Sequence, residues 1–301
     1  MMNKSYKVNE IKPAWKLIIH GIIALYAMLC VVPFFLVVAI SFTDEKTLGL
    51  NGYSFIPAKL SFDAYSYILS GSSMVLQAYG ITILATFVGT FLGLLVTSLY
   101  AYAISRKDFR YGRFFTGYAA VTMLFSGGLV PWYLVCTQLL HLNDTFYALI
   151  IPYLINAFFV IIMKTFFQSG VPDSIVESAK LDGAGEFRIF FSIVTRISLP
   201  AFATVGLFLA LTYWNDWWLP MMFIEDQSLV NLQFLLYRIQ NNMVFLTSSL
   251  VSADASASVA DMPAESARMA MAVLATGPII LAYPFVQKYF VKGLTLGAVK
   301  G

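Results

Sequence analysis

Six long apolar stretches decide what this chain can fold into. A helix needs about 20 mostly apolar residues to cross the hydrocarbon layer of a membrane, and each stretch has about that length. Charged residues make up only 12% of the chain, whereas a soluble domain carries about a quarter. The sequence therefore predicts an all-α integral membrane protein whose spans form one bundle. The predicted spans run near residues 17–42, 81–104, 114–140, 146–167, 199–218 and 269–290.

Lysine and arginine residues are distributed unequally between the two sides of this bundle. With the N-terminus placed inside, all but four of the 19 fall on the inner side, and the exceptions are Lys46, Lys59, Arg238 and Arg268. Cytoplasmic loops of membrane proteins carry an excess of Lys and Arg. We therefore expect both termini in the cytoplasm, and we take the positive charge as a topology signal rather than a nucleic-acid site. The predicted parts are a cytoplasmic segment 1–16, a transmembrane domain 17–290 with external loops 43–79 and 221–266, and a cytoplasmic tail 291–301.

The stretch 171–200 is a polar island on the predicted cytoplasmic side. Ser174 and Glu177 have the spacing of a capping box at a helix start, and Gly183 and Gly185 break that helix, as glycine does where a left-handed residue follows the last turn. The pattern predicts a helix, a turn and a second helix, which together could bind another protein. One apolar stripe is expected on the second helix, made by Phe187, Phe190, Phe191 and Val194.

Several spans contain small or helix-breaking residues. Gly89 and Gly93 form a GxxxG spacing that predicts close helix packing. The hydroxyls of Thr86, Thr90 and Thr97 are expected to bond across that contact. The third span is interrupted at 126–128 and at Pro131, and the fourth by Pro152. Such breaks either line an aqueous cavity, as in transporters, or only kink a structural helix.

The end of the fifth span, YWNDWW, surrounds an amide and a carboxylate with three tryptophans. An aromatic belt at the membrane interface explains tryptophans without any ligand, but aromatic faces beside polar side chains also suit a sugar. Both interpretations stay open. The candidate substrate path consists of Trp132, Tyr133, Asn156, Tyr213, Trp214, Asn215 and Asp216.

The two external loops carry different expectations. The polar and aromatic mixture in 43–79 predicts a short folded cap. In 221–266 the first part has the periodicity of a helix, with Leu232, Leu235, Leu236 and Ile239 on one face. The second part, 248–260, is rich in Ser and Ala and is expected to be a mobile loop that docks an external partner.

The chain lacks the motifs of the commoner enzymes. It contains no GxxxxGK[ST], HExxH or GxSxG sequence, so we expect no catalytic residue and no nucleotide hydrolysis. Cys30 and Cys136 lie in apolar spans without paired spacing, which favours buried thiols over a disulfide or a metal site. Any energy for transport is expected to come from a partner.

The polar island resembles a known motif. Glu177-Ser178-Ala179, then Asp182-Gly183, then the nine residues from Ala184 to Ser192 before Ile193 resemble the EAA loop of ABC-importer permeases. Thr195-Arg196 stands where that loop has Leu-Pro, so the second helix is expected to extend to Leu199-Pro200. The runs LFSGGLVPWYL, YWNDWW and GLTLGAVKG are similar to permeases of maltose-type carbohydrate importers, with the subgroup for polysaccharide-derived oligosaccharides as the best match.

This resemblance implies a type I ABC-importer permease fold in a bacterial cell membrane. It implies a heterodimer with a second permease subunit, two ABC ATPase subunits that bind ATP and Mg, an extracytoplasmic solute-binding protein and an oligosaccharide substrate. The chain itself would bind no cofactor. The residues implied in ATPase coupling are Glu177, Ser178, Ala179, Asp182, Gly183, Ala184, Phe187, Phe190 and Phe191. Contacts from the tail would come from Leu294, Gly297 and Lys300.

Two other classes of function compete with transport. A membrane sensor or scaffold would use the same island to dock a cytoplasmic partner without conducting a solute. An intramembrane enzyme is a weaker alternative, because polar groups such as Asn156 and Asp216 show no arrangement of nucleophile and base.

Overall fold

The structure of the chain, a computed structural model, describes residues 13–70, 72–247 and 263–280. These residues form two compact units: residues 13–70 with 245–247 and 263–274, and residues 72–244 with 275–280. The described residues are helical, with a single isolated β-bridge between Thr43 and Leu60 and no strand.

The first unit contains the N-terminal helix α1 (Pro13–Ser41) and the segment that follows it. Residues Trp15–Ser41 are long and apolar enough to cross a membrane. Among the described residues, none of the most apolar part of that helix is buried. An apolar helix of this length is suited to lipid or to another subunit.

The segment after α1 is folded, as the sequence predicted for a cap. It contains α2 (Glu45–Asn51) and α3 (Asp63–Leu69). Asp44 caps α2 by accepting a hydrogen bond of 3.2 Å from the amide of Thr47. The carboxylate of Glu45 in turn accepts bonds from the amides of Glu265 and Ser266, at 2.9 and 3.0 Å. Glu45 therefore caps the helix at 264–280, which lies some 220 residues later in the chain.

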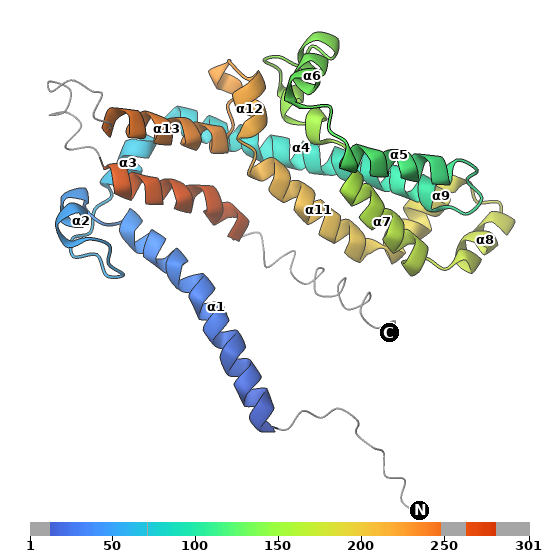
Figure 1. Ribbon diagram of the computed structural model, residues 1–301, viewed down its shortest axis with the longest axis horizontal. Coiled ribbons are helices and arrows are strands. Elements are labelled where there is room, and N and C mark those ends of the chain that lie inside the picture. The colour runs from blue at the N-terminus through green and yellow to red at the C-terminus, as the bar shows by residue number, and fades with distance from the viewer. Residues whose placement is uncertain (1–12, 71, 248–262, 281–301) are drawn as a thin grey trace, which may run out of the picture. The chain divides into compact units, whose positions relative to one another are not determined.

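The second unit is built around α4 (Ser72–Ser105), which packs along α7 (Ala157–Gly170) and α11 (Leu199–Trp214) (Figure 1). The close packing expected at Gly89 and Gly93 is confirmed. A Cβ atom on Gly89 would lie 2.5 Å from the ring of Tyr213, and one on Gly93 would lie 3.4 Å from the carbonyl oxygen of Leu154. Helix α4 begins at Ser72, so residues 72–79, which the sequence placed in the external loop 43–79, belong to the helix.

The hydrogen bonds expected from three threonines of α4 are not formed. The hydroxyls of Thr86, Thr90 and Thr97 are buried and have no hydrogen-bond partner among the described residues. The glycines bring α4 against the rings and methyl groups of Tyr213 and Leu209, and these atoms accept no conventional hydrogen bond at that contact. Close packing, not hydrogen bonding, joins these helices.

The other long apolar stretches are bent, as the breaks in the sequence predicted. Helix α5 (Gly112–Leu124) is followed by α6 (Leu129–Leu134) and the π turn η1 (Val135–Leu139) at an angle of 117°. Gly128, between them, has φ +89°. The 3₁₀ turns η2 (Phe146–Leu149) and η3 (Ile151–Tyr153) precede α7 at 53°.

A third bend of 86° separates residues Glu186–Ile197 from α11. It falls at Ser198, so the helix before it ends at Ile197 and Leu199-Pro200 begin α11. The second helix of the hairpin runs past Thr195-Arg196 but stops two residues short of the expected Leu199. The described residues hold two helices that could cross a membrane alone, or up to five spans if each bent pair is one. The sixth predicted span, 269–290, lies partly outside the described residues, as does the whole of 248–260.

The remaining helices connect these elements. They are α8 (Asp173–Leu181), α9 (Glu186–Ile189), the π turn η4 (Phe190–Val194), α10 (Thr195–Ile197), α12 (Trp218–Phe223), the 3₁₀ turn η5 (Gln227–Leu229) and α13 (Leu232–Thr247). Helix α13 confirms the helical periodicity seen in the first part of 221–266. Leu232, Leu235 and Leu236 are buried.

The contact at Gly89 gives a test of this packing. Replacing Gly89 with valine would drive a side chain into the ring of Tyr213, and overpacking of this kind costs about 1–3 kcal/mol. We expect a lower midpoint of thermal unfolding for Gly89→Val in detergent. Gly80→Val is the matched control, because a Cβ on Gly80 in the same helix has no atom within 4 Å. Equal midpoints for the two variants would contradict the close approach.

Candidate functional site

Residues 173–197 form a helical hairpin, which Figure 1 shows at one end of the second unit. Its turn has the full set of hydrogen bonds of a Schellman motif. The amide of Gly183 donates to the carbonyl of Lys180 at 3.0 Å, and the amide of Ala184 donates to Ala179 at 2.9 Å. Gly183 has φ +79°, a conformation that only glycine adopts without strain. The turn predicted from Gly183 is confirmed, but Gly185 has φ −72° and begins α9 in extended backbone.

The start of the hairpin differs from the predicted capping box. Helix α8 begins at Asp173, its N-cap is Pro172, and no side chain caps it. Proline fixes φ near −65° and lies at −62° here, which lets the helix begin one residue before Ser174. Ser174 is therefore inside the first turn, where it cannot act as the N-cap.

The second helix of the hairpin also differs from prediction, because its apolar residues do not form one stripe. Phe190 and Val194 are buried, at 2% and 1% exposure, whereas Phe187 and Phe191 are 73% and 52% exposed. Phe187 and Phe191 share one side of the helix and Phe190 and Val194 another, and only the second side faces the core. The buried face is instead made by Ile189, Phe190 and Val194.

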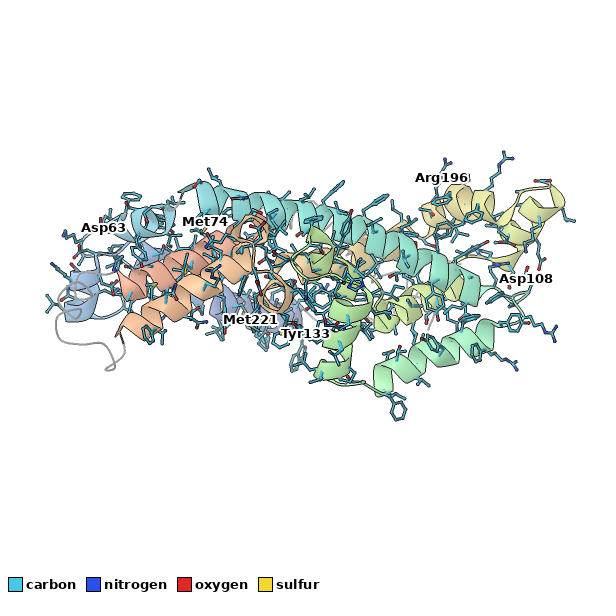
Figure 2. The ribbon with its side chains drawn as sticks, turned by 90° about the horizontal axis from the view of Figure 1, so that it is seen from above. Asp63, Met74, Asp108, Tyr133, Arg196 and Met221 are labelled. Atoms are coloured by element: carbon cyan, nitrogen blue, oxygen red, sulfur yellow. The ribbon has the colours of Figure 1, made fainter. Side chains whose placement is uncertain are left out.

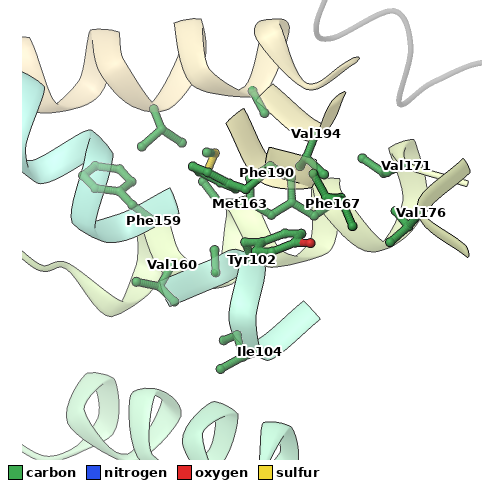
Figure 3. Close-up of a cluster of buried hydrophobic side chains, with 14 of the residues drawn as sticks. Tyr102, Ile104, Phe159, Val160, Met163, Phe167, Val171, Val176, Phe190 and Val194 are labelled. Carbon is green, nitrogen blue, oxygen red and sulfur yellow. The ribbon is translucent and has the colours of Figure 1, made fainter. Parts of the chain in front are cut away.

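A hydrophobic core fixes the hairpin to the ends of α4 and α7. Tyr102 of α4 lies with Met163 and Phe167 of α7 against Phe190 of η4 (Figure 3). The ring centroids of Tyr102 and Phe190 are 5.2 Å apart. Val176 and Ala179 extend this core into α8. The hairpin is therefore packed on the helix ends along its length, with its other faces left exposed.

The nine residues predicted for ATPase coupling divide between these two environments. Ala179 and Phe190 are buried in the core, and Ala184 is half-buried. The remaining six are exposed: Glu177, Ser178, Asp182, Gly183, Phe187 and Phe191. Leu181, which the motif did not single out, is 89% exposed. Large exposed apolar side chains on a rigid hairpin mark a surface for another protein.

Lys180 joins the hairpin to the loop that follows α4. Its Nζ lies 2.6 Å from Oε1 of Glu186 at the start of α9. It also forms an ion pair with Asp108, which lies between α4 and α5 (Figure 2). Asp108 and then Glu186 raise the pKa of the Lys180 amine by favouring its charged form. The pKa of Asp108 is lowered mainly by its hydrogen bond from Lys180.

The other oxygen of the Glu186 carboxylate is held by α4 itself. Oε2 accepts a hydrogen bond of 2.5 Å from the hydroxyl of Tyr102, whose side chain is only 6% exposed. The guanidinium carbon of Arg106 lies 5.9 Å from the centroid of the Tyr102 ring. A pocket of about 460 Å³ lies beside this group. The sequence did not predict this cluster, because Lys180 lies 72 residues from Asp108 and Glu186 lies 84 residues from Tyr102.

The polar residues of the predicted substrate path mostly bond to the backbone. Oδ1 of Asp216 accepts hydrogen bonds from the amides of Trp218 and Leu219, at 3.0 and 3.1 Å, and so caps α12. Asn156 accepts from the amide of Phe158 at 2.9 Å and caps α7. Asn215 donates to the carbonyl of Leu211 at 2.9 Å. Asn215 is the C-cap of α11, so the fifth helix ends at Trp214, four residues before the predicted 218.

The aromatic residues of the path lie in two environments. Tyr213 and Trp214 are buried at 2% and 8% exposure, and the hydroxyl of Tyr213 donates to the carbonyl of Ile150 at 3.0 Å. The indole of Trp214 donates to the carbonyl of Ala275. Tyr133 stacks on Phe223 with ring centroids 5.5 Å apart, and Trp132 lies 5.4 Å from the same ring.

A second pocket of about 520 Å³ lies at the break in the third apolar stretch. It combines aromatic rings, a tyrosine hydroxyl and exposed glycine backbone. The lining residues are Ser126, Gly127, Gly128, Leu129, Pro131, Trp132, Val135, Tyr153 and Trp218. The break therefore borders a pocket, which agrees with the cavity interpretation. Of the predicted path, only Trp132 lines it, and the structure adds Tyr153 and Trp218.

Within the described ranges, no group of three or more His, Cys, Asp or Glu side chains could hold a metal ion. Cys30 is exposed and Cys136 is buried, and both are free thiols.

The chain is similar to several transport proteins over nearly its whole length, although no protein-family model matches it. The polygalacturonan/rhamnogalacturonan transport system permease protein YtcP of Bacillus subtilis (strain 168) is 40% identical over 287 residues, covering 95% of this chain and 98% of that protein. Protein LplC of the same organism is 36% identical over 272 residues, covering 90% of each.

A solved structure shows the same fold. It is that of a bacterial ABC transporter involved in the import of the acidic polysaccharide alginate. One of its chains matches with a TM-score of 0.78 and 25% identity, covering 94% of this chain and 100% of that chain. The helical arrangement described above is therefore one that a known importer uses.

The turn of the hairpin can be tested with two neighbouring glycines. A side chain at Gly183 would have to adopt the left-handed conformation, which costs roughly 1–2 kcal/mol for an L-residue. We expect Gly183→Val to speed hydrogen exchange at the amides of residues 183 and 184, because the Schellman bonds weaken. Gly185→Val is the control, since φ there is −72° and a Cβ has no atom within 4 Å. Equal exchange in both variants would show that the turn does not need glycine at 183.

Proposed function

Since the chain belongs to the permease subunits of carbohydrate ABC importers, we propose that it forms half of the pathway for an oligosaccharide and couples it to ATP hydrolysis by partner ATPases. Similarity to YtcP across 95% of the chain carries this proposal. The bent apolar stretches and the pocket at residues 126–135 support it, because broken helices at membrane depth border cavities in transporters.

The hairpin is proposed as the EAA coupling element. The excess of Lys and Arg on one side of the predicted bundle favours a cytoplasmic position for it. Its rigid packing on α4 and α7, with Phe187, Phe191 and Leu181 exposed, suits insertion into another protein, since apolar anchors in buried pockets dominate interface energies. Glu177 and Asp182 would accept hydrogen bonds there. Phe190 would support the hairpin from inside, not as a contact.

The proposed assembly has five proteins. A second permease would complete the pathway, two ATPase subunits would bind ATP and Mg below it, and an extracytoplasmic binding protein would deliver the sugar. This chain would bind no cofactor and catalyse no reaction. It would lie in the bacterial cell membrane as a six-span protein with both termini in the cytoplasm. Leu294, Gly297 and Lys300 are proposed as a second ATPase contact and lie outside the described residues.

The pocket at the break is the proposed point of sugar contact. The rings of Trp132 and Trp218 offer apolar faces for the C–H face of a pyranose, while Tyr153 and the backbone around Gly128 offer hydrogen bonds to hydroxyls. The names of the relatives, which include polygalacturonan and arabinooligosaccharide permeases, support an oligosaccharide derived from a complex polysaccharide.

Reconstitution with its partners distinguishes transport from docking. In vesicles that contain both permeases, the ATPases and the binding protein, we expect the sugar to stimulate ATP hydrolysis and to accumulate inside. Any energy from ATP would come from the partner ATPases, because the chain has no nucleotide motif of its own. Stable docking of the ATPases without any solute flux would favour a scaffold over a permease. Vesicles without ATP are the control.

Variants of two adjacent tryptophans can distinguish a sugar-binding role from an aromatic belt at the membrane interface. Trp218 lines the pocket, whereas Trp217 stacks on Tyr237 with ring centroids 4.9 Å apart. If the pocket holds sugar, Trp218→Ala should lower the uptake rate several-fold through loss of the stacking face. Trp217→Ala should then leave uptake near that of the wild type. A similar loss in both variants would favour the belt, and no loss in either would remove the pocket from the path.

A further inference from the structure

The contacts around Lys180 connect parts of the chain that the backbone does not. The hairpin follows α7 and precedes α11 in sequence, and it joins α11 through the bend of 86° at Ser198. Helix α4 lies more than 65 residues earlier. Yet Glu186 is bonded to Tyr102 of α4, and Lys180 is paired with Asp108 just beyond its end.

The same contacts also lock the two helices of the hairpin to each other. Lys180 lies on α8 and Glu186 begins α9, on opposite sides of the turn at Gly183. Their ion pair of 2.6 Å closes that turn. Each carboxylate or amine in the group has a second partner, so the hairpin cannot open without breaking bonds to α4 or to its loop.

Apolar packing alone would not fix this orientation. The core of Tyr102, Phe167 and Phe190 holds the hairpin against the helix ends, but hydrophobic contacts are non-directional. Charge-assisted hydrogen bonds have defined geometry and are stronger than neutral ones. The Tyr102 hydroxyl is held at the edge of that core, so its bond to Glu186 fixes the angle between the hairpin and α4.

We propose that Lys180 is a positioning residue that locks the hairpin to α4, so that a push on the hairpin moves α4 instead of turning the hairpin about Ser198. This rests on the proposed function, in which partner ATPases displace the hairpin. The movement reaches the rest of the second unit through the packing of Gly89 on Tyr213, where α4 and α11 meet without room for slippage. The brace consists of Lys180, Glu186, Tyr102 and Asp108, and none of these belongs to the surface proposed to touch the ATPase.

A nearby ion pair provides the matched control. Lys107 lies 2.6 Å from Asp173 and also links the loop after α4 to α8. The Lys107 side chain is 84% exposed, compared with 34% for Lys180, whereas the carboxylates in both groups are about half exposed, at 42% for Asp173, 56% for Asp108 and 49% for Glu186. Exposed ion pairs contribute little to stability because water and salt screen them. Removing Lys107 takes away the same charge from the same region without opening the brace.

The experiment measures the sugar imported per ATP hydrolysed in the reconstituted importer. We expect Lys180→Met to lower this ratio several-fold while the partner ATPases still bind and hydrolyse ATP, because the hairpin would move without α4. Tyr102→Phe, which keeps the ring in the core and removes only the hydroxyl, should lower it in the same direction. Lys180→Arg should restore it, and Lys107→Met should leave it unchanged.

The outcomes separate this inference from the proposed function. A wild-type ratio in assembled Lys180→Met overturns the brace, and so does a wild-type ratio in Tyr102→Phe if Lys180→Met fails to assemble. An equal loss in Lys107→Met also overturns it, since general charge near α8 would then be responsible. If the wild-type assembly neither accumulates sugar nor responds to it, the proposed function fails instead.

Discussion

The second unit depends on the close approach of α4 and α11 at Gly89. A glycine is required there because the ring of Tyr213 occupies the space of a side chain. That ring is itself fixed by the bond from its hydroxyl to the carbonyl of Ile150, which belongs to the broken segment before α7. In lipid, helices gain little from hydrophobic burial against each other, so such contacts and their dispersion energy hold them together.

Two positions on α4 show how other elements attach to this helix. The hydroxyl of Thr82 accepts a hydrogen bond of 2.8 Å from the amide of Leu232 and so fixes the start of α13 to α4. Near the C-terminal end of α4, Tyr102 bonds to Glu186 and packs on Phe190. Both contacts combine a polar bond with burial, which gives a defined angle as well as stability.

Two polar residues of the apolar stretches serve mainly to cap the starts of helices. Asp216 and Asn156 stood out in the sequence because polar groups in lipid are costly and usually functional. In the structure each accepts hydrogen bonds from backbone amides at a helix start. A broken helix needs such caps, because its first amides have no partner within the helix. Asp216 also helps to shape the pocket, since it accepts hydrogen bonds from two lining residues, at 3.0 Å from the amide of Trp218 and at 3.4 Å from the hydroxyl of Tyr153.

The sequence by itself determined the features that depend on neighbouring residues. Apolar length predicted the membrane helices, the glycines and prolines predicted the breaks at 126–128 and the turn at Gly183, and the motif around Glu177 predicted the family. Only the tertiary structure decided which residues of the hairpin face inward, because α4 and α7 cover the side of the second helix that carries Phe190 and leave Phe187 outside. It alone joined Lys180 to Asp108 and Glu186 to Tyr102, since contacts across more than 70 residues leave no local signal. Helical periodicity describes one helix, whereas packing is decided by the surfaces of all the helices that meet there.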